Sequence, residues 1–117
     1  MKARFLGFGA IEIDGRRYED DVMIDRGEVR KRRKGPSKPF RDRYGHTPLS
    51  TEEAIPWGGR RLIVGTGAYG ALPVMPEVEE EARRRHVRLT AVPTDEACRL
   101  VEELDRSEVC AILHVTC

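Results

Sequence analysis

Three cysteines and three histidines are the side chains of this sequence best suited to act as nucleophiles or metal ligands. His114 and Cys117 lie near the end of the sequence, and His46 lies in its middle. A thiolate beside an imidazole could perform nucleophilic chemistry or help to bind a metal ion. No two cysteines have CxxC spacing, and their odd number disfavours a disulfide framework. We therefore predict no catalytic residue and no metal site. We favour a hydrogen-bonding role for His114 at a sheet end, and we assign the three residues only to a candidate small-ligand site.

The segment Gly65–Gly70 reads Gly-Thr-Gly-Ala-Tyr-Gly and matches the GxGxxG pattern of phosphate-binding loops. In such loops the glycines allow a tight turn and bring backbone N–H groups close to a phosphate. Here Pro73 and Pro76 delay the following helix, and no acidic residue follows at the spacing that a dinucleotide site needs. We favour a structural turn, keep a small-anion or small-ligand site as the alternative, and expect no cofactor. The ligand-binding candidates in this loop are Gly65, Thr66, Gly67 and Tyr69.

Positive charge is concentrated between Arg26 and Arg43, where nine Lys and Arg residues accompany two acidic ones. Basic side chains near Phe40 and Tyr44 could track a nucleic-acid backbone, or they could bind an acidic protein. Strand alternation would divide the basic run between two faces, which favours a solvated arm that protects a sheet edge. Nucleic-acid binding is the least favoured of the three. The partner-binding candidates are Arg30, Lys31, Arg32, Arg33 and Lys34.

The first half of the chain predicts antiparallel strands. Asp14-Gly15 is a hairpin signal between two β-favouring runs, and further strands are expected around residues 22–24 and 28–33. Glycines and prolines interrupt residues 34–49, so we predict no regular element there. Residues 50–54 suggest a short helix, with Ser50 as N-cap and Glu53 as the capping-box acid.

The second half predicts the order β-α-β-α-β. Strands are expected at residues 61–64, 87–92 and 109–115, with helices at 76–85 and after Thr94, its predicted N-cap. The last strand is apolar at both parities, which is typical of a central strand. Because parallel strands are joined by right-handed crossovers, this half should add parallel strands to the antiparallel ones. We predict an α/β fold with a mixed sheet and packed helices.

The composition predicts one folded domain, residues 1–117, with 39% hydrophobic and 35% charged residues and a net charge of +1. No signal-like segment opens the sequence, and no apolar run approaches the roughly 20 residues of a membrane span. We expect a cytoplasmic protein without membrane contact.

Six short motifs follow one another along the chain: Asp14–Tyr18, Asp21–Ile24, Gly45–Thr47, Val64–Gly67, Pro93–Ala97 and His114–Cys117. In this order they resemble the archaeal "MTH nine-three-eight"-like domain family. That family includes the adipogenesis-associated Mth-like domain protein of animals and, more distantly, a mitochondrial assembly factor of respiratory complex I. The resemblance covers nearly the whole chain. It implies a three-layer fold with a mixed sheet of about five strands and no established enzymatic activity.

These observations favour a small protein of undefined biochemical role, a protein-interaction or assembly module rather than an enzyme. A small-anion or small-ligand domain at Gly65–Gly70 is the first alternative, and nucleic-acid binding through Arg30–Arg43 is the second. The sequence leaves the protein partner unidentified and a homodimer open.

Overall fold

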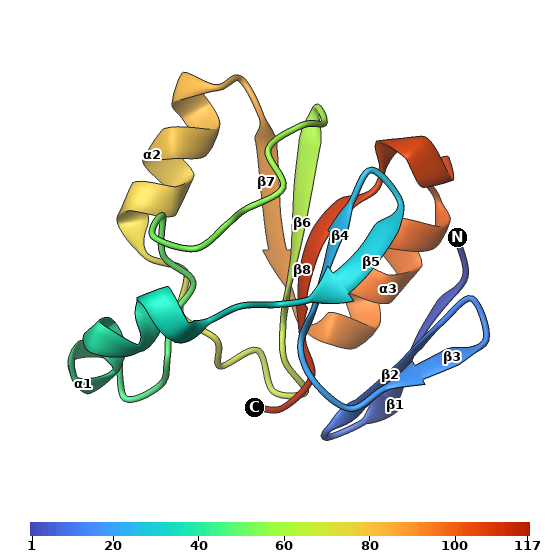
Figure 1. Ribbon diagram of the computed structural model, residues 1–117, viewed down its shortest axis with the longest axis horizontal. Coiled ribbons are helices and arrows are strands. Elements are labelled where there is room, and N and C mark those ends of the chain that lie inside the picture. The colour runs from blue at the N-terminus through green and yellow to red at the C-terminus, as the bar shows by residue number, and fades with distance from the viewer.

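The computed structural model describes residues 1–117 and forms two sheets with short helices around them (Figure 1). The strands are β1 (Ala3–Gly7), β2 (Ala10–Ile13), β3 (Arg16–Tyr18), β4 (Val22–Asp25), β5 (Glu28–Lys31), β6 (Arg61–Thr66), β7 (Arg88–Val92) and β8 (Cys110–His114). The helices are η1 (Gly35–Phe40), α1 (Arg41–Tyr44), α2 (Pro76–Arg84), α3 (Thr94–Glu102) and η2 (Arg106–Glu108).

The main sheet has five strands in the order β5-β4-β8-β6-β7. Strand β6 runs parallel to both β7 and β8, and β4 pairs antiparallel with β8 and with β5. The chain passes from β6 through α2 to β7, and then through α3 back across β6 to β8. The predicted mixed α/β sheet with a β-α-β-α-β second half is confirmed.

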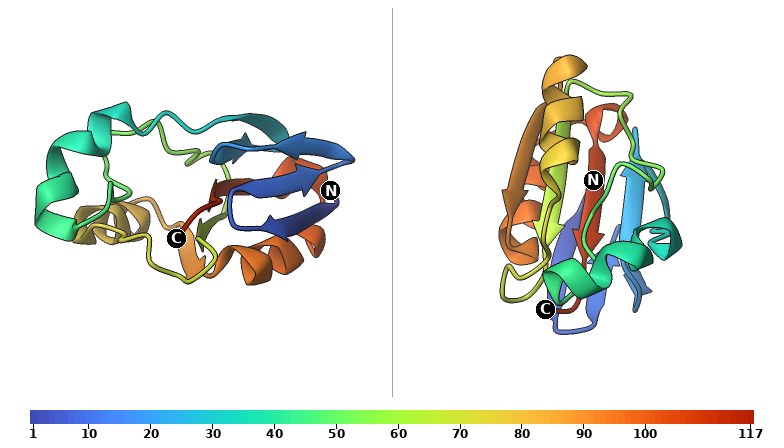
Figure 2. Two further views of the ribbon diagram at one scale, coloured as in Figure 1. Left: turned by 90° about the horizontal axis from the view of Figure 1, so that it is seen from below. Right: turned by 90° about the vertical axis from the view of Figure 1, so that its left-hand side faces the viewer.

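Two apolar layers cover the sheet because the residues of its inner strands alternate between its faces. On one face Ile63 and Leu113 pack with α3 and with β1 and β2. On the other face Val64 and Ile112 pack with α2 and with the segment before β6. Figure 2 shows the sheet standing between these two layers, as the predicted three-layer fold requires. Both parities of β8 are buried, as expected for a central strand.

The antiparallel front half is divided between two sheets. Asp14 and Gly15 both adopt positive φ, at 50° and 82°, and form the predicted hairpin turn between β2 and β3. With β1 these strands make a separate three-stranded sheet. This small sheet packs on α3, where the Ala3 N–H donates to Glu102 Oε1 at 3.0 Å. Only the β4–β5 hairpin joins the main sheet.

Three local predictions are wrong. Residues 50–54 form turns instead of a helix, because the Glu53 carboxylate is bound to Arg32 and does not close a capping box. Residues 34–49 contain η1 and α1. Helix α3 has Pro93 as its N-cap, and the Thr94 hydroxyl donates instead to the backbone oxygen of His114 at 2.5 Å.

None of the helices has the length and apolar character that crossing a membrane would require.

Candidate functional site

A pocket of about 180 Å³ lies at the carboxyl ends of β5 and β8. Ligands of open α/β sheets bind beyond the carboxyl ends of the strands, so this is the expected position for a site. Its walls come from segments far apart in the sequence, namely the chain after β5, helix α1 with the turn that follows it, and the chain after β8. The lining residues are Arg32, Lys34, Arg41, His46, Thr47, His114, Thr116 and Cys117.

A buried ion-pair network forms the floor of the pocket. The Arg32 guanidinium donates Nε and Nη2 to the two carboxylate oxygens of Glu53, each at 2.8 Å, and Nη1 to Asp21 Oδ2 at 2.9 Å. All three side chains are less than 10% exposed. Burial lowers the pKa of Arg32, but the hydrogen bonds to Glu53 and the charge of both acids outweigh it and raise that pKa. Arg32 therefore stays charged, and the two carboxylates that bind it exceed its single positive charge by one.

The same network forms hydrogen bonds with the segment between β5 and β6, which covers this end of the sheet. The Ser37 hydroxyl, in η1, donates to Glu53 Oε2 at 2.5 Å and lies 2.6 Å from the Ser50 hydroxyl. The Arg32 Nη2 also donates to the backbone oxygen of Pro48 at 3.2 Å. Since buried polar groups are costly unless bonded, these contacts fix the segment between β5 and β6 over the sheet.

Asp21 orients the His114 ring. Its Oδ2 lies 2.8 Å from His114 Nδ1, and its Oδ1 accepts the N–H of Val115 at 2.9 Å. Burial raises the pKa of Asp21, but the hydrogen bond from His114 and the charges around it outweigh that effect and bring the pKa to about 2. An ionised Asp21 can only accept a hydrogen bond, so His114 Nδ1 carries the hydrogen and donates it. In the neutral form of the ring, this tautomer leaves Nε2 as an acceptor.

The Cys117 thiol lies between two imidazoles. Its Sγ is 3.8 Å from His114 Nε2 and 3.4 Å from His46 Nδ1. The Thr116 hydroxyl is a nearer neighbour of His114 Nε2, at 3.1 Å. Asp21, His114 and Cys117 thus follow one another as in an acid–imidazole–thiol array. No group of three or more His, Cys, Asp and Glu side chains is arranged to hold a metal ion.

The glycine loop after β6 forms hydrogen bonds with the backbone of Thr116 and Cys117 and so fixes their position. Ala68 donates its N–H to the backbone oxygen of Thr116 at 2.6 Å, and Tyr69 and Ala71 donate to that of Cys117 at 3.2 and 2.9 Å. A Cβ on Gly67 would lie 2.3 Å from the backbone carbon of Cys117, so only glycine permits this approach. Gly67 also donates its own N–H to the Thr94 hydroxyl at 2.8 Å.

Of the predicted ligand-binding residues, the structure brings His46, His114 and Cys117 together in the pocket. The glycine-loop candidates Gly65, Thr66, Gly67 and Tyr69 do not line it. The loop N–H groups that could have met an anion are bonded to the chain itself, and Tyr69 is 79% exposed beside Phe8. The loop is therefore the structural turn that the sequence favoured.

The basic run is divided, as strand alternation predicted. Arg30 pairs with Glu28 and Lys31 with Asp20, and both are exposed. The prediction that Arg32 binds a partner is corrected, because its guanidinium is buried and forms ion pairs with Glu53 and Asp21. Lys34 turns toward the pocket, and Arg33 lines a separate surface hollow with Lys31.

Sequence reasoning missed Asp21 and Glu53 as site residues, and it included Arg41 only in the basic segment Arg30–Arg43 considered for nucleic-acid binding. Asp21 and Glu53 act through Arg32, which is more than ten positions away from each, so neither spacing nor periodicity reveals them.

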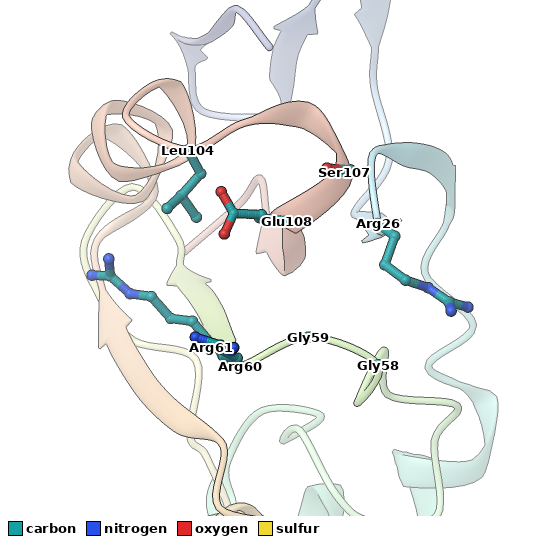
Figure 3. Close-up of a pocket in the computed structure, with 8 residues that line it drawn as sticks. All are labelled: Arg26, Gly58, Gly59, Arg60, Arg61, Leu104, Ser107 and Glu108. Atoms are coloured by element: carbon teal, nitrogen blue, oxygen red, sulfur yellow. The ribbon is translucent and has the colours of Figure 1, made fainter.

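A larger pocket, of about 390 Å³, lies at the opposite end of the sheet, between the β4–β5 turn, the start of β6 and η2 (Figure 3). It holds three arginines but no histidine, cysteine or aspartate. Arg26 pairs with Asp25, and in Figure 3 its guanidinium points away from the Glu108 carboxylate. The Nε of Arg61 is buried without a hydrogen-bond partner. Ser107 and Glu108 also line this pocket, but it contains no thiol and no imidazole.

Comparison with known proteins gives matches over nearly the whole chain. The family described as "Protein of unknown function (DUF498/DUF598)" matches residues 4–114. The solved structure of conserved hypothetical protein PH1505 from Pyrococcus horikoshii OT3 is 31% identical, with full coverage (100%) of both chains and a TM-score of 0.79. The structure called MT938 is 27% identical, with 99% of this chain and 98% of that chain covered and a TM-score of 0.69. No curated protein matches the chain. The resemblance seen in the sequence motifs is confirmed.

Proposed function

The chain belongs to the DUF498/DUF598 family of proteins of unknown function, and we propose from its own site that it binds a small anion in the pocket at the carboxyl ends of β5 and β8. The observation that carries this proposal is the pair Lys34 and Arg41. Both line the pocket, and neither forms an ion pair with an acidic side chain. Two uncompensated cations facing one hollow attract an anion.

The charge balance of the surrounding residues supports the same proposal. The third cation of the pocket, Arg32, is matched by Glu53 and Asp21, and no carboxylate side chain lines the pocket. Three cations (Arg32, Lys34 and Arg41) against two carboxylates (Asp21 and Glu53) leave the side chains of the pocket and its floor with a net charge of +1. Arginine is well suited to hold phosphate or carboxylate because its N–H groups match two oxygens at once.

The size of the pocket limits the ligand. At about 180 Å³ the pocket is smaller than the roughly 300–1,000 Å³ that is typical of pockets for drug-sized ligands. Inorganic phosphate or a small carboxylic acid fits this space, whereas a dinucleotide does not. The proposed ligand class is therefore a small phosphate or carboxylate compound.

The test is titration with inorganic phosphate and with small mono- and dicarboxylates, followed by NMR shifts and calorimetry. We expect saturable binding that a Lys34→Ala/Arg41→Ala double variant weakens at least tenfold. Arg60→Ala is the matched control, since Arg60 is an exposed arginine that lines the pocket at the other end of the sheet. Unchanged affinity in the double variant, or an equal loss in the control, would refute the proposal.

A role as a protein-interaction module remains a second proposal, supported by one surface feature. Phe8 and Tyr69 are 62% and 79% exposed, and their ring centroids lie 6.3 Å apart. Adjacent exposed aromatics are enriched where proteins bind one another.

A further inference from the structure

We propose that Cys117 is a nucleophile, that His114 is its general base, and that Asp21 is the positioning residue of that base. The substrate class is an ester or thioester of a small acid whose anionic group is held by Lys34 and Arg41. The substrate class rests on the proposed anion site, whereas the assignment of nucleophile and base rests on separate contacts.

The first support is the order of the contacts. Asp21 Oδ2 lies 2.8 Å from His114 Nδ1, and His114 Nε2 lies 3.8 Å from Cys117 Sγ. A buried carboxylate on one ring nitrogen fixes the tautomer that leaves the other nitrogen free to accept a proton. A thiol becomes a strong nucleophile once such a base accepts its proton.

The second support is that the base is held rigidly. Asp21 is itself fixed by Arg32 and by the N–H of Val115, so the carboxylate that orients His114 has little freedom. His46 approaches the thiol from the opposite side, with Nδ1 3.4 Å from Sγ. When His46 Nδ1 carries a proton, it donates to the thiolate and stabilises it.

The third support is accessibility. Cys98 and Cys110 are buried in the core, whereas Cys117 is partly exposed and lines the pocket. Burial raises the pKa of Cys98 to about 12, so that thiol is protonated at neutral pH. Cys117 alone among the three thiols combines access, a base and neighbouring cations.

The reaction can be written so that atoms balance. The Cys117 thiol gives its proton to His114 Nε2, and the sulfur attacks the carbonyl carbon of the substrate. A new S–C bond forms, the C–O or C–S bond to the leaving group breaks, and the leaving group takes its electron pair and the proton from His114. Water then attacks the acyl-Cys117 thioester, with His114 as base, and restores the thiol while releasing the acid.

The experiment measures alkylation of the full chain at pH 7 by iodoacetate, which is an anion, and by iodoacetamide, which is neutral. Mass spectrometry assigns the modified cysteine, and N-acetylcysteine gives the reference rate. We expect Cys117 to react at least tenfold faster than N-acetylcysteine with iodoacetate. A Cys117 rate no higher than the reference for both reagents would overturn the proposal.

Variants test whether His114, and not a neighbouring residue, is the base that activates Cys117. His114→Ala should slow both reagents at least tenfold, and added imidazole should restore much of the rate, which a merely structural role would not allow. His46→Ala, at an exposed position, should slow alkylation less and should not disturb folding. Thr116→Val removes the hydroxyl that competes for His114 Nε2 and should preserve or raise the rate. A His114→Ala protein that is folded and reacts like wild type would overturn the assignment of the base.

The two reagents also separate this proposal from the anion site. The Lys34→Ala/Arg41→Ala variant should lose the preference for iodoacetate over iodoacetamide while Cys117 keeps its reactivity toward the neutral reagent. Loss of preference alone therefore supports both proposals. A fast thiol with no preference in the wild type contradicts the anion site only, and a slow thiol contradicts the nucleophile.

Discussion

Both ends of the five-stranded sheet carry a pocket with arginines, but the two ends differ in the hydrogen bonds that their arginines form. At the carboxyl ends of β5 and β8, Arg32 is buried and has an acceptor for every side of its guanidinium. At the amino end of β6, the Nε of Arg61 is buried with no acceptor. The larger pocket therefore has the less complete hydrogen bonding, so the volume of a pocket alone does not identify a functional site.

The difference follows from what covers each end. The carboxyl end is closed by the segment between β5 and β6 and by the glycine loop, and both are bonded into it. The amino end is bordered by η2 and the β4–β5 turn, where Arg106 donates to the backbone oxygen of Gly27 at 2.9 Å. A preorganised site needs fixed partners around its reacting groups, and at the carboxyl end Asp21 holds His114 and is itself held by Arg32.

The largest expected effect comes from removing the arginine at each end. Arg32→Met leaves the carboxylates of Asp21 and Glu53 buried without their cation, which should lower the free energy of unfolding by about 3–5 kcal/mol. Arg61→Met removes an unsatisfied donor and keeps most of the side-chain volume, so it should change that free energy by about 1 kcal/mol or less. Urea denaturation at pH 7 measures both.

Arg30→Met provides a further control, because Arg30 is exposed and pairs only with exposed Glu28. If Arg32→Met and Arg61→Met destabilise the protein equally, the contrast between the two ends is wrong.

Local signals in the sequence predicted most of the fold. The Asp14-Gly15 turn, the helix that begins at Pro76 and the apolar last strand each depend on residues close together in the chain, and all three are observed. Division of the front half into two sheets was not predicted, because it depends on the packing of β1 against α3, about 100 residues away.

The candidate site was predicted only in part for the same reason. His46, His114 and Cys117 were identified from their chemistry, and folding brings them together. Glu53 matched a capping box locally, yet its carboxylate binds Arg32, 21 positions away. The glycine loop matched a phosphate loop locally, yet its N–H groups are used by Thr116 and Cys117. In both cases a long-range partner outweighed a local pattern.

Acid should lower the free energy of unfolding by protonating Asp21 at the carboxyl end of the sheet. The pKa of Asp21 is about 2 in the folded protein, below its ordinary value of 3.8, so its ionised form contributes stability above pH 4. That contribution, about 2 kcal/mol, is lost as pH falls from 4 toward 2. Unfolding free energy measured from pH 6 to pH 2 should show this loss in wild type and a flatter profile in Asp21→Asn. Glu108→Gln, at the other pocket, should keep the wild-type slope, and an equal flattening there would contradict the assignment to Asp21.

The smallest expected effect comes from replacing one glycine at each end of the sheet by alanine. Gly67 has φ +103° and abuts Cys117, while Gly27 has φ +85° and abuts Arg106. Alanine is strained at both backbone positions and crowded at both, so each change should cost about 1–2 kcal/mol, measured by urea denaturation. Only Gly67→Ala displaces the segment that carries Cys117, so only it should weaken phosphate binding and slow alkylation of that thiol. Equal loss of both properties in Gly27→Ala would mean that general destabilisation, and not the position of Cys117 against the glycine loop, sets the properties of the site.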